Sequence, residues 1–293
     1  MRLIKPSVEL LEQGTGFYGI YEAIARAAST CYKSEPKFGE AAKLFVDTLI
    51  KNGHTAMLEF GTVYLTIPIK KYVYPDGTHT KQKESKKYQN NQYSKVVISE
   101  DGTKAYVTTN YRVLVENDWL KDLDYLVLHP TEHHIKRYTA KFTISIGVGR
   151  EFLRHRKFSF ANESTRFINY SKDKVGNQCT FIIPSWSNIK EGEYNSPLNA
   201  YSVEEREFIF GYQCYEAEKF YMDLLAAETR PQQAREVLPL CTKSELCMCG
   251  FEEDWVHFFN LRMRGTTGTP HPDAQYIAVE WWRLLKEKFG IEL

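Results

Sequence analysis

The chain has 293 residues, with 38 lysines and arginines against 37 aspartates and glutamates, and its formal net charge is +1. This balance excludes attachment to nucleic acid or to an anionic membrane through bulk charge, although a local basic pocket is compatible with it. A hydrophobic fraction of 43% and an aromatic fraction of 14% exclude wholesale disorder. No run approaches about 18 consecutive apolar residues, and the N-terminus lacks the apolar stretch of a signal peptide. We therefore expect a cytoplasmic globular protein whose six cysteines are reduced thiols.

The N-terminal part of the chain shows the periodicity of two helices and a strand. Apolar residues recur at helical spacing over Tyr18–Tyr32 and again over Glu40–Asn52, which predicts two helices. Apolar residues then alternate with others over 63–69, which predicts a strand. From Lys70 to about Gln92 the composition is polar, and this predicts a mobile or partner-contacting loop rather than core structure.

The middle of the chain combines a hairpin pattern with a helix and a strand. Asp101-Gly102 lies between two short β-prone runs, which predicts a hairpin over 94–109. A helix is predicted over Tyr111–Leu128, ending before Pro130. Alternating apolar residues over Ala140–Val148 predict a strand that leads directly into a basic segment.

The C-terminal half is mostly helical in pattern. Ser202 and Glu205 have the spacing of a capping box, which predicts the start of a long helix that reaches Thr229, and Pro231 suits the first turn of the next helix. A strand and two further helices are predicted at Glu245–Cys249, Glu252–Arg264 and Pro272–Phe289. Because the strands do not alternate regularly with helices, we expect an α+β fold with a mixed or antiparallel sheet flanked by helices, and long helices in the C-terminal half.

Two short motifs have an ordinary structural interpretation. Gly14, Gly16 and Gly19 match a dinucleotide-binding fingerprint, but the preceding segment is not a β-branched buried strand, so a turn before a helix is favoured. Cys247 and Cys249 lack a matching His or Cys pair at structural-zinc spacing, so buried thiols in a core strand are favoured and no metal is expected.

The most informative segment is Arg154–Arg166. Its thirteen residues contain four cationic side chains, an imidazole, three hydroxyl groups and one carboxylate, with phenylalanines interleaved. Guanidinium groups suit phosphate oxygens because their fixed donors bind two oxygens at once. The segment therefore predicts an anion site rather than a structural ion-pair cluster. A nucleic-acid partner is not expected, because such surfaces usually bring excess charge elsewhere.

The same segment resembles a family signature. Arg154-His155-Arg156, followed after seven residues by Ser164, resembles the signature of the flavin-dependent thymidylate synthases. Three more segments resemble the family's flavin-contacting stretch, its second arginine motif and its C-terminal helix motif: His54–Glu59, Ala234–Pro239 and Phe258–Arg262. The resemblance implies a single domain over residues 1–293, in which about 70–138 form an insertion relative to compact members.

The resemblance also implies a reaction and its participants. The family methylates dUMP reductively to dTMP, with methylenetetrahydrofolate as carbon donor and NADPH-reduced FAD as hydride donor, in homotetramers. The catalytic residue implied is Arg262. The residues implied for dUMP are Glu151, Arg154, Ser164, Thr165, Arg166, Arg235 and Arg262, and those implied for FAD are His54, Arg154, His155, Arg156, Asn162 and His257.

Several positions depart from the family's usual residues. Glu151 stands where a nucleotide-contacting glutamine is common, Asn162 where an acidic residue is common, and His257 where a flavin-contacting asparagine is common. Because Ala56 and Glu253 also replace flavin-contacting residue types, one alternative is a catalytically silent nucleotide- or RNA-binding relative. A second alternative is a flavoprotein that reduces another pyrimidine nucleotide.

Overall fold

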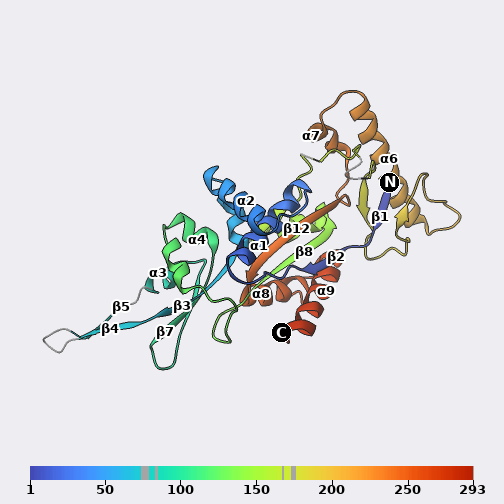
Figure 1. The fold of residues 1–293 in the computed structure, drawn as a ribbon. Helices are drawn as coiled ribbons and strands as arrows, with labels where there is room; N and C mark the ends of the chain where they lie inside the picture. The colour runs from blue at the N-terminus through green and yellow to red at the C-terminus, as the bar shows by residue number, and fades with distance from the viewer. Residues whose placement is uncertain (74–78, 83–84, 167, 173–175, 293) are drawn as a thin grey trace.

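The structure, a computed structural model, describes residues 1–73, 79–82, 85–166, 168–172 and 176–292 (Figure 1). The α-helices are α1 (Gly16–Tyr32), α2 (Gly39–Lys51), α3 (Lys86–Gln89), α4 (Tyr111–Glu116), α5 (Ile146–Phe152), α6 (Glu205–Ala226), α7 (Pro231–Ala234), α8 (Glu252–Arg262) and α9 (Pro272–Phe289). The 3₁₀ turns are η1 (Thr55–Phe60), η2 (Leu120–Tyr125) and η4 (Arg235–Val237). The strands are β1 (Arg2–Ile4), β2 (Ser7–Leu10), β3 (Thr62–Pro68), β4 (Lys70–Val73), β5 (His79–Gln82), β6 (Lys95–Ile98), β7 (Lys104–Asn110), β8 (Arg137–Ser145), β9 (Ser159–Asn162), β10 (Thr180–Ile182), β11 (Gly192–Glu193) and β12 (Lys243–Phe251).

A four-stranded antiparallel sheet of order β2-β8-β12-β9 lies at the centre of the molecule, with α1 on one face and α8 and α9 on the other (Figure 1). Side chains of β12 alternate between the two faces, as the pleat of a strand requires. Leu246 and Met248 pack into the core formed with α8 and α9, whereas Cys247 and Cys249 pack with Ala27 of α1. Both faces of β12 are therefore buried, which explains its nearly continuous apolar sequence.

The predicted α+β class is confirmed, and so are the buried thiols of the core strand and the turn at the glycine motif. Cys247 and Cys249 are fully buried in a core strand. The glycine motif forms the turn that opens α1: Gly16 has φ of +64°, and a Cβ on Gly19 would lie 1.9 Å from the carbonyl oxygen of Gly14. Both positions thus need glycine for backbone geometry.

Two further layers flank the central sheet. The sheet β3-β7-β6 packs with α1, α2 and α4 around its own core, and the ribbon β4-β5 projects from it (Figure 1). At the opposite end, the sheet β10-β1-β11 packs with α6 and α7 (Figure 1). The helices predicted over 18–32, 40–52 and 272–289 and the hairpin over 94–109 are confirmed.

Two predictions for the region of the insertion are wrong in part. The polar range 70–92 contains β4, β5 and α3 rather than only a loop, and Tyr88 of α3 is fully buried with its hydroxyl donated to Asp122 at 2.6 Å. Residues 74–78 and 83–84 of that range lie outside the described residues. The helix predicted over 111–128 ends at Glu116, because Asp118 adopts a left-handed conformation with φ of +58° before η2 begins.

Two predicted element boundaries are also wrong. The strand predicted to reach Val148 ends at Ser145, whose side-chain oxygen accepts a hydrogen bond from the Val148 amide at 3.1 Å and so caps α5. The basic segment therefore follows a short helix rather than a strand. The capping box of α6 is formed by Glu204 and Glu207, not by Ser202 and Glu205.

Candidate functional site

Arg262, the last residue of α8, is held by two residues of the α5 region. Its Nε donates to His155 Nε2 at 2.9 Å, and its Nη1 forms an ion pair with Glu151 Oε2 at 2.6 Å. Its Nη2 donates to the main-chain oxygen of Glu151 at 2.5 Å. Three residues predicted for the site, from segments about 110 residues apart in sequence, are thus brought into direct contact.

The imidazole of His155 is neutral at physiological pH. Burial lowers its pKa to about 4, and the nearby cationic Arg262 contributes in the same direction. Because Nε2 accepts the hydrogen bond from Arg262, the single ring proton resides on Nδ1. His155 therefore positions the guanidinium without adding a second positive charge.

A cavity of about 310 Å³ opens beside this cluster. Its lining residues are Arg154, His155, Arg156, Lys157, Phe158, Asp254, His257, Leu261 and Arg262. Arg154 and Arg156 are exposed and make no hydrogen bond or ion pair with any described residue. Asp254 is the one carboxylate of the lining, and burial raises its pKa. The Lys157 Nζ lies 3.8 Å from Asp254 Oδ1. The cavity is therefore cationic and suited to an anionic group.

A second group of predicted residues lies around Arg235 of η4. Its Nη1 donates to Thr165 Oγ1 at 2.7 Å, which joins the second arginine motif to the end of the basic segment. The neighbouring Ser164 is held by its amide, which donates to the carbonyl oxygen of Cys31 at 3.2 Å. Arg166 follows directly and is exposed. Thr165 and Arg235 thus bring a hydroxyl and a guanidinium together, next to Ser164 and Arg166 in the chain.

The predicted site residues thus form two groups rather than one. Within the described parts of the chain, no hydrogen bond or ion pair joins Arg235 or Thr165 to the cluster around Arg262. His54 is exposed before η1, and Asn162 accepts a hydrogen bond from Ser244 Oγ at 3.0 Å. His257 lines the cationic cavity.

A buried ion pair next to Ser164 was not among the residues predicted for the site. Glu163 and Lys243 are only 3% and 7% exposed, and the Lys243 Nζ lies 2.7 Å from Glu163 Oε2. The Glu245 amide also donates to Glu163 Oε2, at 2.8 Å, and Lys243 Nζ contacts Glu245 Oε1 at 2.6 Å. The one available sequence signal was the charge pair Lys243 and Glu245, which stand two residues apart at the start of the predicted strand.

Two acidic residues at or near positions where the family contacts flavin form ion pairs with arginine and lysine side chains of the insertion. Glu59 Oε1 lies 2.6 Å from Arg112 Nη1, and Glu253 forms an ion pair with Lys95. Among the described residues, no group of three His, Cys, Asp or Glu side chains is arranged to hold a metal ion. No helix among them is both long and apolar enough to cross a membrane.

Comparison with known proteins gives a consistent family. The chain is 28% identical over 150 residues to a flavin-dependent thymidylate synthase of Corynebacterium aurimucosum, covering 50% of this chain and 55% of that one. It is 30% identical over 149 residues to the Corynebacterium glutamicum enzyme of the same name, covering 49% and 54%. A probable flavin-dependent thymidylate synthase of Paramecium bursaria Chlorella virus 1 is 26% identical over 137 residues, with 46% and 61% covered. The chain thus spans a little over half the length of the curated relatives it matches.

Among solved structures, the UMP/dUMP methylase PolB from Streptomyces cacaoi, bound with 5-Br dUMP, aligns over 98% of this chain and 93% of its own. That alignment has a TM-score of 0.44 and 15% sequence identity. The family profile described as thymidylate synthase complementing protein matches residues 78–290. Because this match covers well over half of the sequence, the family resemblance is confirmed, and the chain belongs to the thymidylate synthase complementing protein family.

Proposed function

We propose that the protein is a flavin-dependent thymidylate synthase that methylates dUMP to dTMP, with FAD as its cofactor. The observation that carries this proposal is the fixed position of Arg262, which His155 and Glu151 hold at the wall of a cationic cavity. A guanidinium oriented before substrate arrives stabilises negative charge on an activated pyrimidine ring without reorganising. NADPH and methylenetetrahydrofolate are the co-substrates in this proposal.

The phosphate of dUMP is assigned to the second group of residues. Arg235 and Arg166 supply guanidinium donors, while Ser164 and Thr165 supply hydroxyl groups. A dianionic phosphate needs several charge-assisted donors to replace its hydration shell, and this stretch provides them. Glu151 and Arg154 complete the proposed nucleotide site.

The residues around the first cavity have the charge to hold the pyrophosphate of a flavin dinucleotide. Arg154 and Arg156 are cations without a described partner, so they are available to the pyrophosphate, and His155 and His257 lie beside them. His54 and Asn162 are the more distant members of this proposed set. When bound, FAD would supply the hydride that reduces the transferred one-carbon group.

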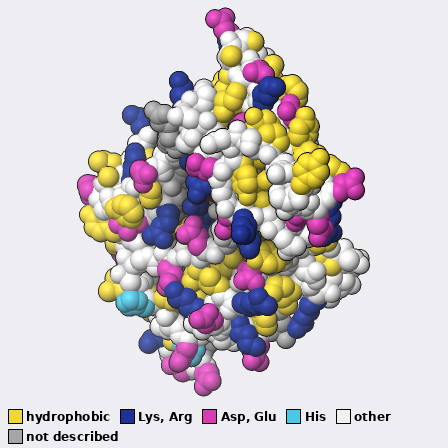
Figure 2. All heavy atoms as spheres, turned by 90° about the vertical axis from the view of Figure 1, so that its right-hand side faces the viewer, with side chains coloured by type: hydrophobic (Ala, Val, Ile, Leu, Met, Phe, Trp, Pro, Cys, Tyr) yellow, Lys and Arg dark blue, Asp and Glu magenta, His cyan; other side chains and the backbone are white. Residues whose placement is uncertain are grey.

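A homotetramer is part of the proposal, because within the described residues of one chain no hydrogen bond or ion pair joins the pair of Arg235 and Thr165 to the cluster around Arg262, and a neighbouring chain can complete the site. The face that carries α6 supports assembly, since hydrophobic side chains gather on it among scattered charges (Figure 2). Ile209, Tyr212 and Phe220 of α6 are 60%, 46% and 52% exposed. Exposed apolar groups of this size are typical of protein interfaces. We further propose one domain over residues 1–293, elaborated at 70–138, and a cytoplasmic location.

The proposal is tested by colour and by turnover. The purified protein should absorb as a flavoprotein or take up added FAD, and it should release tritium from C5-labelled dUMP when methylenetetrahydrofolate and NADPH are present. Uptake of FAD without tritium release would contradict the methylation step. Light scattering at assay concentration tests the tetramer separately, and an active monomer would contradict it.

A second candidate function is a nucleotide- or RNA-binding relative without catalysis. The observation that favours it is that Ala56 and Glu253 stand where flavin-contacting residue types are usual, and that Glu253 forms an ion pair with Lys95 of the insertion. A protein that binds dUMP in calorimetry but fails to bind FAD would support this candidate over the first.

A further inference from the structure

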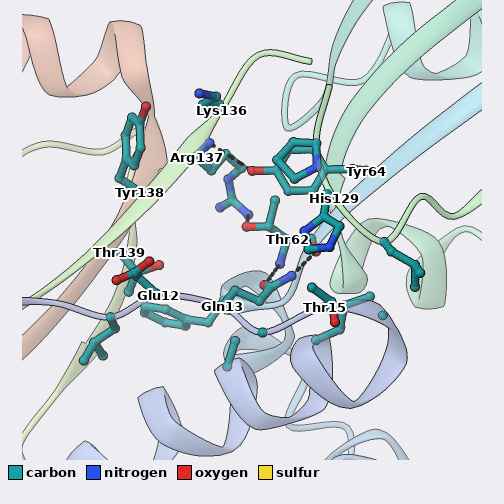
Figure 3. A pocket seen from close by; sticks show the side chains of 18 of the residues that line it. Glu12, Gln13, Thr15, Thr62, Tyr64, His129, Lys136, Arg137, Tyr138 and Thr139 are labelled. Carbon is teal, nitrogen blue, oxygen red and sulfur yellow. Dashed lines mark hydrogen bonds between the residues drawn. The ribbon is translucent and has the colours of Figure 1, made fainter. Parts of the chain in front are cut away.

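A second cavity, of about 240 Å³, lies where the insertion meets the central sheet. Its walls come from the turn before α1, from β3, from the start of β8 and from the segment 126–130 that follows η2 (Figure 3). None of its lining residues belongs to the proposed nucleotide or flavin site. A ligand of this cavity is therefore independent of the proposed function.

The charge of this cavity is positive and largely uncompensated. Arg26, Lys136 and Arg137 line it, and none of them forms an ion pair with a carboxylate among the described residues. The one acidic lining residue, Glu12, is ion-paired with Lys288 outside the lining. Three cations thus share one cavity without a carboxylate partner, which makes it attractive to an anion.

Arg137 is the most constrained of these cations. Its Nη1 donates to the carbonyl oxygen of Glu59 at 3.0 Å and to Thr62 Oγ1 at 3.2 Å, and its Nη2 donates to Ser159 Oγ at 3.4 Å. Its buried Nε has no hydrogen-bond partner. Neutral oxygens and the ring of Phe251, whose centroid lies 5.5 Å from Cζ, thus hold the guanidinium in place and leave its charge without a carboxylate partner, a costly arrangement for a partly buried ion.

The polar floor of the cavity is rigid. The Gln13 side chain donates to the carbonyl oxygen of Thr62 at 2.8 Å and accepts from the Thr62 amide at 2.8 Å, so it is locked against β3 (Figure 3). Tyr64 accepts from the Arg137 amide at 3.5 Å on the other side of Thr62 (Figure 3). The arrangement resembles a formed site more than a gap between surfaces.

The rest of the lining is apolar and partly aromatic. Tyr138 and Phe289 pack with ring centroids 4.8 Å apart, while Leu128 of the insertion is 67% exposed. Phe60 and Leu126 also contribute apolar surface. The volume is below the roughly 300 Å³ at which drug-sized ligand pockets begin, so it suits a molecule with one ring.

We propose that this cavity binds a small aromatic anion, a single ring that carries a carboxylate or a phosphate group. The anionic group lies against Arg137, with Arg26 and Lys136 of the lining adding positive charge, and the ring lies against the apolar wall. Since Arg137 also contacts Glu59 of η1 and Ser159 of β9, the occupant stabilises the junction between η1 and the central sheet.

Calorimetry with four probes tests the required chemistry. Benzoate and phenyl phosphate combine a ring with an anionic group. Inorganic phosphate has the anionic group without the ring, and benzyl alcohol has the ring without the anionic group. We expect one of the first two to bind at least tenfold more tightly than both partial probes, and the preferred one identifies the anionic group. Equal affinities across the four probes would overturn the proposal.

Matched variants and a soaked crystal test the location. Lys136→Glu and Arg26→Glu should weaken the preferred probe at least tenfold, while Lys121→Glu, an exposed lysine of η2 outside the cavity, should leave it unchanged. The anomalous signal of iodine from 4-iodobenzoate or 4-iodophenyl phosphate, matching the preferred anion, should appear in this cavity. Iodine only beside Arg154 and Arg262, or a second copy of the chain filling the cavity, would overturn the proposal, as would equal losses in all three variants.

Discussion

Arg262 donates a hydrogen bond from Nε to the Nε2 of His155 at 2.9 Å, so the arginine assigned to catalysis rests on an imidazole that must be unprotonated. Protonation of His155 would replace this hydrogen bond with repulsion between two cations. The orientation of Arg262 is therefore coupled to the protonation state of His155, although the two residues are separated by 107 positions in the sequence.

The first prediction concerns stability at mildly acidic pH. The folded protein holds the pKa of His155 at about 4, against an ordinary value of 6.5. Between these values the unfolded chain binds a proton that the folded chain does not, so the free energy of unfolding should fall as the pH decreases from about 6.5 toward 4. Above pH 6.5 this contribution is fully present. Urea unfolding of the wild type and of His155→Gln across this range gives, for each protein, the slope of the free energy of unfolding against pH.

His155→Gln retains an oxygen that accepts from Arg262 but does not titrate, so its stability should depend less on pH. His129→Gln, changed at an exposed imidazole, serves as the matched control and should keep the wild-type slope. Identical slopes for the wild type and His155→Gln would contradict the assignment of a neutral His155.

The second prediction concerns the buried pair beside Ser164. Lys243→Met leaves the carboxylate of Glu163 without its closest cation, and it should lower the free energy of unfolding by about 3–5 kcal/mol. The double variant Lys243→Met with Glu163→Gln removes both charges and should recover a measurable part of this loss. Urea denaturation of the two single variants and the double variant gives the coupling energy. Strict additivity of the two changes would contradict a direct pair.

The sequence predicted elements well where local chemistry decides them. The helix over 272–289 begins at a proline and ends before Gly290, which adopts φ of +68°, and both signals are local. The predicted strand to Val148 failed because Ser145 caps a helix, and apolar alternation does not distinguish that helix from a strand. The pair of Glu163 with Lys243 was not predictable from spacing, since register between β9 and β12 brings the two together across 80 positions.

The same distinction applies to the candidate site. The motif resemblance identified Arg262, His155 and Glu151 separately, but only the packing of α8 beside α5 makes them contact one another. The cavity at Arg137 carried no motif, because its walls come from five segments that are far apart in sequence.

The third prediction concerns phosphate binding. Arg235→Ala should weaken dUMP binding by roughly 1.5–3 kcal/mol, the scale of a hydrogen bond to a charged group. Thr165→Val, which removes the hydroxyl that accepts from Arg235 Nη1, should weaken it less because the guanidinium remains. Calorimetric titration with dUMP measures both effects. Arg206→Ala, at an exposed arginine of α6, is the control and should bind as the wild type does. Wild-type affinity in Arg235→Ala would remove this residue from the nucleotide site.

The last prediction compares two arginines at the end of α8. Arg262→Ala should reduce thymidylate formation by about 10² or more at saturating dUMP, because a preorganised cation stabilises charge that develops only during the reaction. Arg264→Ala, two residues further along, loses an exposed side chain that donates to Asn260 Oδ1 at 3.3 Å and should turn over normally. Both variants should retain FAD absorbance and NADPH-dependent reduction of the flavin. If Arg262 merely complemented the helix dipole, the two substitutions would each cost about 0.3–1 kcal/mol of stability and leave turnover intact. Single-turnover assays together with thermal melts of both variants distinguish the two outcomes, and equal turnover by the two proteins would exclude the catalytic role.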